Sequence, residues 1–273
     1  MKPSRFDYER PGDLSTVIRL IQREDIVVKI VAGSQSLGPM LNLRLVQPDL
    51  LVDITGIAQL KRVEVSADAI VIGACVTHAD IEDGRVPDVT GGALSKVARG
   101  IAYRAVRNRG TLGGSLVHAD PSADWVSSLA AAGAEVLIAG PSGQRRVAIE
   151  DFMTGVFEVD LQAGEMLEAV RIPRFSARAR WGYHKLCRKT GEFAHAIGVV
   201  LHDPERDLCR VVLGATESKP IVVKDARALF PDGRRLDVAA AHQLLDGVGH
   251  ADALSKQIHM AALKRAVDRA EQP

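Results

Sequence analysis

At 273 residues, the chain is long enough to bury a sizeable core as one large domain or as two smaller ones. Lysines and arginines number 35 and acids 34, and aromatic residues make up only 4%, which argues against a basic, base-stacking nucleic-acid protein. The polar N-terminus lacks the apolar segment of a secretory signal, and no apolar run reaches membrane-spanning length. We therefore expect a cytoplasmic protein without a membrane span and without a nucleic-acid partner.

In the first half of the chain, helical and strand patterns alternate, which is typical of an α/β or α+β fold. Thr77 is expected to cap a helix, and Gly133 is expected to end one. The predicted elements are a helix over 14–21, strands over 27–33 and 48–54, a strand and a helix start within 69–83, helices over 92–108 and 121–134, and a strand over 135–140.

A change of pattern near residue 175 predicts a domain boundary, because Pro173 and a basic polar stretch interrupt the elements there. We expect a domain over 1–175, itself split near residue 55, and a second domain over 176–273. The second domain reads as a small antiparallel sheet followed by helices. Its predicted strands cover 181–188, 196–202 and 209–215, and its predicted helices cover 237–247 and 251–270.

The three cysteines, Cys75, Cys187 and Cys209, lie far apart and form no CxxC pair. Iron–sulfur and structural zinc sites need clustered ligands. We therefore expect buried or half-buried thiols and no metal site in this chain.

Two glycine-containing segments share a design. Residues 31–40 (VAGSQSLGPM) and 110–115 (GTLGGS) each offer backbone N–H groups and small polar side chains, and glycine lets a phosphate approach the backbone closely. Neither segment fits GxxxxGK[ST], and no GxGxxG opens a helix after a strand. Each segment taken alone is either a tight turn or an anion-binding loop.

Two aspartates follow the second segment. Asp120 precedes Pro121 and reads as a helix N-cap, which leaves Asp124 in the first helical turn. The alternative is contact with a ligand, and a carboxylate beside a phosphate loop would then contact hydroxyl groups, because it repels phosphate oxygens. A ligand with a pyrophosphate next to a polyol satisfies both demands. FAD is such a ligand.

Three motifs together resemble a known family. VAGSQSLGPMLNLRLVQPDLLVDI (31–54) resembles the first FAD loop of the medium, flavoprotein subunits of molybdenum hydroxylases; NRGTLGGSLVHADPSADW (108–125) is similar to their second loop, and GYHKLCRKTGEFAHAIGVV (182–200) to the start of their C-terminal domain. This family includes carbon monoxide dehydrogenase medium subunits and xanthine dehydrogenase FAD domains. The resemblance implies an α+β fold, with a vanillyl-alcohol-oxidase (PCMH) type FAD-binding domain of two α+β subdomains and a C-terminal antiparallel sheet with helices.

By position, the resemblance also implies which residues contact FAD. The pyrophosphate is expected at residues 29–37 and at the second loop, Asp124 at the ribityl or adjacent hydroxyls, Ile101 against the flavin ring, and Lys185 near its pyrimidine edge. The expected cofactor-binding residues are Lys29, Ile30, Val31, Ala32, Gly33, Ser34, Gln35, Ser36, Leu37, Thr77, His78, Ile101, Gly110, Thr111, Gly113, Gly114, Ser115, His118, Asp120, Asp124, Leu167 and Lys185.

The sequence departs from the family pattern at two places. Ser34 stands where a second glycine is common, and serine fits there only if its φ is negative. The family's Arg-Arg pair and later aspartate correspond here to Arg188, Lys189 and Glu192, which preserves the charges.

Four of the eight histidines invite a functional interpretation. His118 lies in the second loop and is either a cofactor contact or a solvated loop residue, and His78 lies at a helix start that reaches the same cleft. His184 and His195 are expected on strands, as packing or surface residues.

The sequence thus predicts an oxidoreductase subunit that carries FAD. In such a complex a large molybdopterin subunit oxidises the substrate, a small subunit with 2Fe–2S clusters relays electrons, and this chain passes them to quinone, NAD or oxygen. The resemblance implies a dimer of heterotrimers, and it leaves the substrate open among carbon monoxide, aldehydes and aromatic heterocycles. The alternatives are a stand-alone flavoprotein oxidase and a flavin-free scaffold of the same fold.

Overall fold

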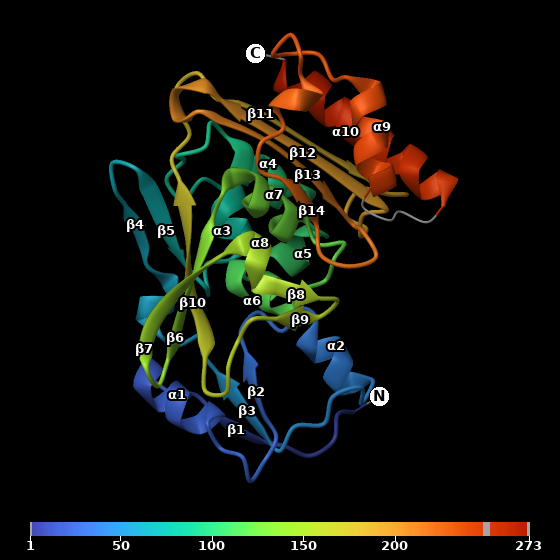
Figure 1. The fold of residues 1–273 in the computed structure, drawn as a ribbon. Coiled ribbons are helices and arrows are strands. Elements are labelled where there is room, and N and C mark those ends of the chain that lie inside the picture. Colours follow the sequence, from blue (N-terminus) through green and yellow to red (C-terminus); the bar gives the residue numbers. More distant parts are fainter. Residues whose placement is uncertain (1, 248–251, 272–273) are drawn as a thin grey trace.

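The computed structural model describes residues 2–247 and 252–271. Figure 1 shows a small N-terminal sheet at the bottom, a longer twisted sheet above it, and a C-terminal sheet near the top, with helices between the upper two sheets and outside the last one. Helices and separate, mostly antiparallel sheets confirm the predicted α+β class.

The N-terminal sheet is parallel, with the strand order β1-β3-β2. The predicted first helix forms because its apolar face packs on the core and because the Asp13 carboxylate accepts a hydrogen bond from the Thr16 N–H at 2.8 Å. The elements of this part are β1 (Asp7–Glu9), α1 (Leu14–Ile21), β2 (Val28–Val31), α2 (Leu37–Asn42) and β3 (Leu50–Asp53).

The second sheet is antiparallel, with the order β4-β5-β10-β6-β7. Its central strand, β10, pairs with β5 on one side and β6 on the other, although β10 lies about thirty residues beyond β6 in the chain. The bounds are η1 (Ala58–Lys61), β4 (Val63–Val65), β5 (Ala69–Gly73), β6 (Glu135–Gly140), β7 (Gly143–Ala148), α8 (Ile149–Phe152), β8 (Met153–Gly155), β9 (Glu158–Val159) and β10 (Met166–Pro173).

Five helices connect β5 to β6. Every residue of the last one, α7, is buried, and α7 lies between the second sheet and the C-terminal sheet. As predicted, Thr77 caps the first of these helices and Gly133, at φ +69°, ends the last. The bounds are α3 (His78–Glu82), α4 (Ala93–Gly100), α5 (Arg104–Arg107), α6 (Leu112–His118) and α7 (Asp124–Ala132).

Three expectations for these helices were wrong. The helix predicted over 92–108 is two helices, because Ala102 adopts φ +42° and interrupts the helical backbone. Helix α7 begins at Asp124 rather than at Pro121, since the Asp120 carboxylate accepts from the Ser122 N–H in a local turn instead of capping a helix. The second glycine segment is not a loop throughout, because its residues from 112 onward form α6.

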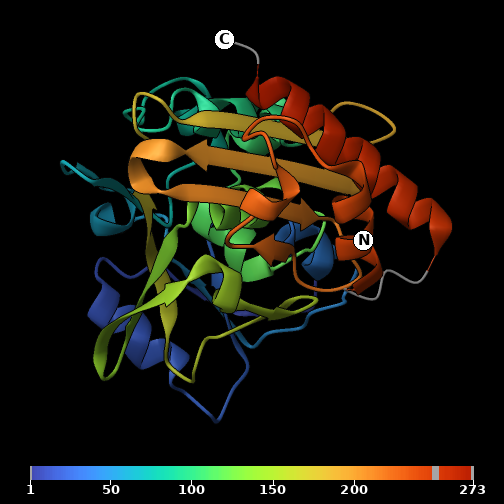
Figure 2. The ribbon, with the colours of Figure 1, turned by 45° about the horizontal axis from the view of Figure 1, so that its top comes forward.

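The C-terminal sheet is antiparallel, with the order β11-β12-β13-β14, and its two faces meet different helices. A Cβ added at Gly182 or Gly198 would lie less than 3 Å from backbone atoms of the last helix, which therefore covers that face closely (Figure 2). Tyr183 and Lys185 alternate to the other face, toward α7. The bounds are β11 (Arg180–Leu186), β12 (Ala196–Asp203), η2 (Pro204–Arg206), β13 (Leu208–Gly214), β14 (Ile221–Val223), η3 (Arg227–Leu229), α9 (Val238–Gly247) and α10 (Ala253–Ala270).

Within the described ranges, no helix has both the length and the hydropathy needed to cross a membrane.

Candidate cofactor-binding site

The two glycine segments predicted from the sequence meet in the fold. Gly33 follows β2 and lies against the backbone at the start of the second segment. A Cβ added at Gly33 would come within 2.7 Å of the Arg109 carbonyl carbon and 2.8 Å of the Gly110 Cα. Only glycine permits this approach, so the two segments form one continuous backbone surface.

The first segment presents backbone donors. Among the described residues, the N–H groups of Ser34, Gln35 and Ser36 have no protein acceptor. Their carbonyls are partly used, since the Gly38 N–H donates to the Ser34 carbonyl at 3.0 Å. Three successive unpaired N–H groups before the short helix α2 fit the chemistry of a phosphate.

Ser34 corrects one expectation. Its φ is +59°, in the left-handed region, whereas serine was expected to fit there only at a negative φ. A residue with a side chain is strained at this φ. Two neighbouring contacts hold Ser34 in this conformation: Gly33 before it packs against the second segment, and the Ser34 carbonyl accepts a hydrogen bond from the Gly38 N–H.

In the second segment, fewer backbone N–H groups are free to bind a ligand than its glycines suggest. Thr111 caps α6 by accepting from the Gly114 N–H at 3.0 Å, and the N–H groups of Leu112 and Gly113 donate to carbonyls of the segment after β5. A Cβ at Gly113 would meet the Ala74 Cβ at 2.5 Å, so Gly113 is required by protein packing. Gly114 is exposed, and a ligand can approach the backbone there.

A buried polar cluster joins α7 to β11. The Lys185 ammonium lies 2.9 Å from one Asp124 carboxylate oxygen and 3.2 Å from the other, and the Tyr183 hydroxyl donates to the same carboxylate. The side chains of Asp124 and Lys185 are each 8% exposed, so Lys185 is not the surface lysine that a strand position otherwise suggests. The second hydrogen-bond acceptor of the ammonium is the Gly100 carbonyl, at 2.8 Å.

Burial dominates the electrostatics of this cluster. Desolvation raises the pKa of Asp124 above its usual value, although Lys185 and the Tyr183 hydroxyl partly offset this effect. Desolvation and the nearby Asp124 raise the pKa of Tyr183 well above its usual value. Lysine has three N–H donors, and two directions are used by the protein, which leaves one for a ligand acceptor.

His78 is a buried support for the second segment. It begins α3, its ring lies against Gly110, and the Trp125 indole N–H donates to its Nδ1 at 3.1 Å, which fixes the neutral ring with the proton on Nε2. Burial, and secondarily the positive charge of Arg107, lowers the pKa of His78 to about 4.

The other predicted residues have varied surroundings. Lys29 is exposed on β2, and Leu167 is buried in the core beside an irregularity in β10. The His118 ring lies beside the Phe157 ring in a tilted arrangement, with centroids 5.1 Å apart. Residues that are half-buried near these segments are Ile30, Val31, Ala32, Leu37, Thr77, Ile101, Ser115, His118 and Asp120.

The structure also shows where the two histidines expected on strands and the residues that depart from the family pattern lie. His184 lies on β11 as predicted, but His195 lies just before β12 and is exposed. Arg188 pairs with Glu192 at 3.1 Å, so the opposite charges of these two residues offset each other.

The sequence did not single out Tyr183, which bonds Asp124, Trp125, which bonds His78, or Arg107, which bonds the carbonyls of Ile101 and Ala102. Alternation along β11 places Tyr183 on the same face as Lys185, and this spacing was the available signal. The other two depend on contacts between segments far apart in the chain.

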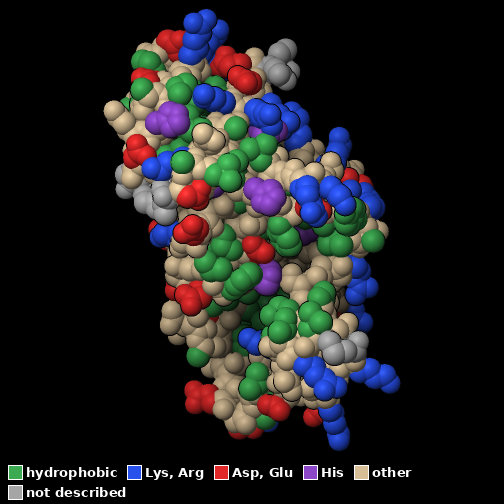
Figure 3. All heavy atoms as spheres, turned by 90° about the vertical axis from the view of Figure 1, so that its right-hand side faces the viewer, with side chains coloured by type: hydrophobic (Ala, Val, Ile, Leu, Met, Phe, Trp, Pro, Cys, Tyr) green, Lys and Arg blue, Asp and Glu red, His purple; other side chains and the backbone are tan. Residues whose placement is uncertain are grey.

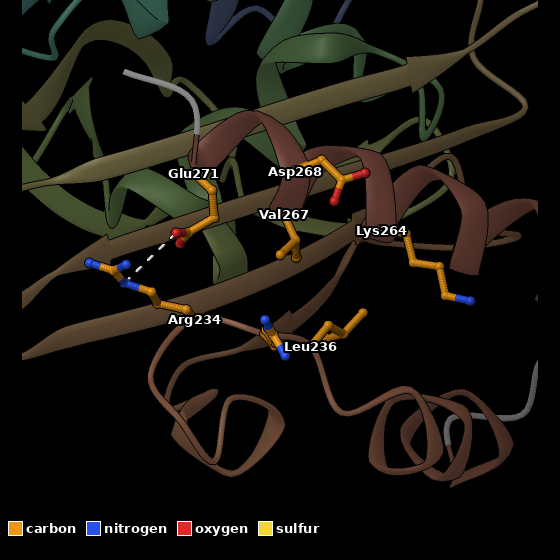
Figure 4. Close-up of a pocket in the computed structure, with 7 residues that line it drawn as sticks. Arg234, Leu236, Lys264, Val267, Asp268 and Glu271 are labelled. Carbon is orange, nitrogen blue, oxygen red and sulfur yellow. Dashed lines mark ion pairs between the residues drawn. The ribbon is translucent and has the colours of Figure 1, made fainter.

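Not every hollow on the surface is lined by the predicted cofactor-binding residues. Figure 3 looks onto the side where α2 and the β8–β9 hairpin lie, and hydrophobic side chains flank a hollow there. A separate open hollow of about 470 Å³ lies beside α10, where an Arg234–Glu271 ion pair of 3.9 Å crosses it (Figure 4). Its lining, none of which was predicted to bind the cofactor, is Arg234, Arg235, Leu236, Lys264, Val267, Asp268 and Glu271.

Among the described residues, no group of three His, Cys, Asp or Glu side chains is arranged so that it could hold a metal ion. The three cysteines are unpaired, and burial raises the pKa of Cys75 to about 12, so that thiol is inert.

Comparison with known proteins agrees with this geometry. Residues 4–175 match the family described as "FAD binding domain in molybdopterin dehydrogenase". The carbon monoxide dehydrogenase medium chain of Hydrogenophaga pseudoflava is 32% identical over 82% of this chain and 78% of its own, and the caffeine dehydrogenase subunit beta of Pseudomonas sp. (strain CBB1) is 32% identical over 81% and 76%. Quinoline 2-oxidoreductase from Pseudomonas putida 86 superposes with a TM-score of 0.85 at 32% identity, covering 99% of both chains.

The fold and the paired glycine segments define a flavoprotein of the molybdenum hydroxylase type. The chain belongs to the family of FAD-binding domains of molybdopterin dehydrogenases, which confirms the predicted resemblance. It is an oxidoreductase chain whose cofactor is FAD and whose role is electron transfer.

Proposed function

We propose that this chain takes electrons from the 2Fe–2S clusters of a small partner subunit and delivers them to an external acceptor. The observation that carries the proposal is the packing of Gly33 against Arg109 and Gly110, beside unpaired N–H groups at Ser34, Gln35 and Ser36. FAD supplies both one-electron and two-electron transfer when bound, which suits a link between clusters and a two-electron acceptor.

In this proposal, each part of the site has a separate task. The amides of Ser34, Gln35 and Ser36 hold the pyrophosphate, with the exposed backbone at Gly114 beside it. Asp124 and Lys185 form a buried, nearly neutral pair, and the remaining Lys185 N–H points its positive charge at the pyrimidine edge of the flavin. Ile101 packs against the ring.

The assembly we propose has three kinds of subunit, arranged as a dimer of heterotrimers, with molybdopterin in the large subunit. Relatives named as a medium subunit and as a complex subunit support a multi-subunit assembly. We place the complex in the cytoplasm, where the unpaired state of the three cysteines is expected. Within the chain, we propose that the FAD-binding unit ends near residue 175 and has two subdomains that meet near residue 55.

Anaerobic reduction of the isolated, FAD-loaded chain tests the function. A reduced 2Fe–2S partner subunit should bleach the flavin, whereas carbon monoxide, aldehydes or aromatic heterocycles alone should leave it oxidised. Rapid bleaching by one of these substrates alone would instead support a stand-alone oxidase. A chain that purifies colourless and takes up no added FAD would support the flavin-free scaffold.

A further inference from the structure

Three consecutive backbone carbonyls at the end of α4 each accept a hydrogen bond from a cationic side chain. Lys185 Nζ donates to the Gly100 carbonyl at 2.8 Å. Arg107 Nη1 donates to the carbonyls of Ile101 and Ala102, at 2.9 Å and 3.1 Å. A helix end normally leaves its last carbonyls unpaired and favours positive charge beside them. Here two cations, one from each side, hold the segment Gly100–Ala102.

Arg107 is itself fixed in direction. Its side chain is 11% exposed, and its Nε and Nη2 donate to the two oxygens of the Glu82 carboxylate at 2.7 Å and 3.0 Å. This two-bond contact sets the plane of the guanidinium, so that Nη1 points at the carbonyls. A lysine at this position has one nitrogen and cannot contact both groups in the same way.

The backbone of the held segment is strained. Ala102 has φ +42°, a strained value for a residue with a side chain. The loop after β11 packs against the same place, since a Cβ added at Gly191 would lie 2.7 Å from the Ala102 carbonyl oxygen. The strain and the close approach are both located where Arg107 donates its bonds.

We propose that Arg107 is a positioning residue for the flavin. This inference rests on the proposed function. Arg107 fixes the Gly100–Ala102 segment so that the Ile101 side chain lies against the flavin ring. Arg107 acts through Ile101 and through its bond to Glu82. Its contribution is to pre-organise the surface that receives the ring before the cofactor arrives.

The same helix provides a matched control. Arg104 also lies on α5 and pairs with the same acid, at 3.0 Å from Glu82, and with Asp83 at 2.6 Å. Its side chain is 47% exposed, and it donates no hydrogen bond to residues 100–102 within the described structure. Arg104→Lys therefore changes an arginine beside the same acids without touching the held segment.

Arg107→Lys and Arg104→Lys are compared in the full chain by three measurements: hydrogen exchange of the amides around residues 100–103 in the FAD-free protein, the FAD dissociation constant, and the visible circular dichroism of the bound flavin. Arg107→Lys should speed exchange, alter the flavin dichroism and weaken FAD binding roughly tenfold, the size typical when a group that orients a ligand contact is lost. Arg104→Lys should leave all three unchanged. Faster exchange with unchanged binding and dichroism would mean a structural role alone and would overturn the proposal.

Two further variants separate the possible failures. Glu82→Gln keeps the shape but loosens the contact with Arg107, and it should show the same changes if Arg107→Lys does not fold. Ile101→Ala should alter the flavin dichroism whatever Arg107 does. An unaltered spectrum there would overturn the flavin placement in the proposed function, whereas an altered spectrum with unaffected Arg107→Lys and Glu82→Gln would overturn only the role of Arg107.

Discussion

Gly33 and Arg109 lie far apart in the sequence, and their backbones touch where a side chain at residue 33 has no room. A Cβ there would lie 2.7 Å from the Arg109 carbonyl carbon, well inside van der Waals contact. Backbone atoms cannot rotate aside as the end of a flexible side chain can. The contact therefore fixes how the first segment lies on the second.

Gly33→Ala should separate the two segments. We expect a loss of roughly 1–3 kcal/mol in the free energy of unfolding, as for other overpacked sites, and FAD uptake well below that of the unchanged protein. Denaturant titration and flavin content per chain measure the two effects. Gly12→Ala is the control, because a Cβ at Gly12 has nothing within 4 Å. Full flavin content in Gly33→Ala would remove the contact from the site.

Ser34 should be sensitive to side-chain branching because its φ is +59°. Valine in the left-handed region is disfavoured by about 1–2 kcal/mol, so Ser34→Val should destabilise the FAD-free protein by that amount more than Ser36→Val does. Ser36 lies in the same segment at φ −106°. Equal denaturation midpoints for the two variants would contradict the assigned backbone conformation.

Much of this fold could be predicted from local patterns. The first helix, the Thr77 cap, the Gly133 stop and the strands β5, β6, β11, β12 and β13 follow from periodicity and capping residues within a few positions, whereas β4, β7, β10 and β14 were not predicted. The break at Ala102 could not be predicted, because alanine gives no local signal for a positive φ and the bonds from Arg107 that stabilise it are tertiary.

The site was harder to predict than the fold. The sequence shows which residues of the site are glycines, but it does not show which contact requires each glycine. Gly33 and Gly113 both make room for protein atoms, respectively the Arg109 backbone and Ala74, and only Gly114 of these three is open at the surface. Such requirements arise when sequence-distant segments pack, so spacing alone does not reveal them.

His78 should make the protein less stable in mild acid. Its pKa is lowered from 6.5 to about 4, so the neutral ring contributes stability above pH 6.5 that is lost as the pH falls from 6.5 toward 4. The full loss corresponds to roughly 3 kcal/mol. His78→Asn keeps an acceptor for the Trp125 indole N–H but does not titrate, so its stability should fall less between pH 7 and pH 4.5. His195→Asn, at an exposed position, should follow the unchanged protein, and parallel curves for all three would refute the assignment.

The Asp124–Lys185 pair should show opposite effects on the flavin when either partner is neutralised. In the proposed placement, Lys185→Met deletes the positive charge beside the flavin, so the midpoint potential should fall, because the reduced form carries more negative charge. Asp124→Asn leaves Lys185 without its counter-charge, so the potential should rise. Spectroelectrochemical titration measures both. Tyr183→Phe, which removes a hydroxyl but no charge, should shift the potential less than either, and shifts of the same sign in the two charge variants would contradict this placement of the pair.

The same pair should also govern stability, with a defined pH dependence. Because burial raises the folded pKa of Asp124 above 3.8, its contribution to stability is fully present below that value and is lost as the pH rises through the folded pKa. Lys185→Met removes the charge that offsets burial, which raises this pKa further and extends the loss to higher pH. At pH 7 the single variant should be destabilised by about 3–5 kcal/mol, since it leaves a buried carboxylate unpaired. Adding Asp124→Asn should recover much of that loss, and a double variant no more stable than Lys185→Met alone would show that the two side chains are not energetically coupled.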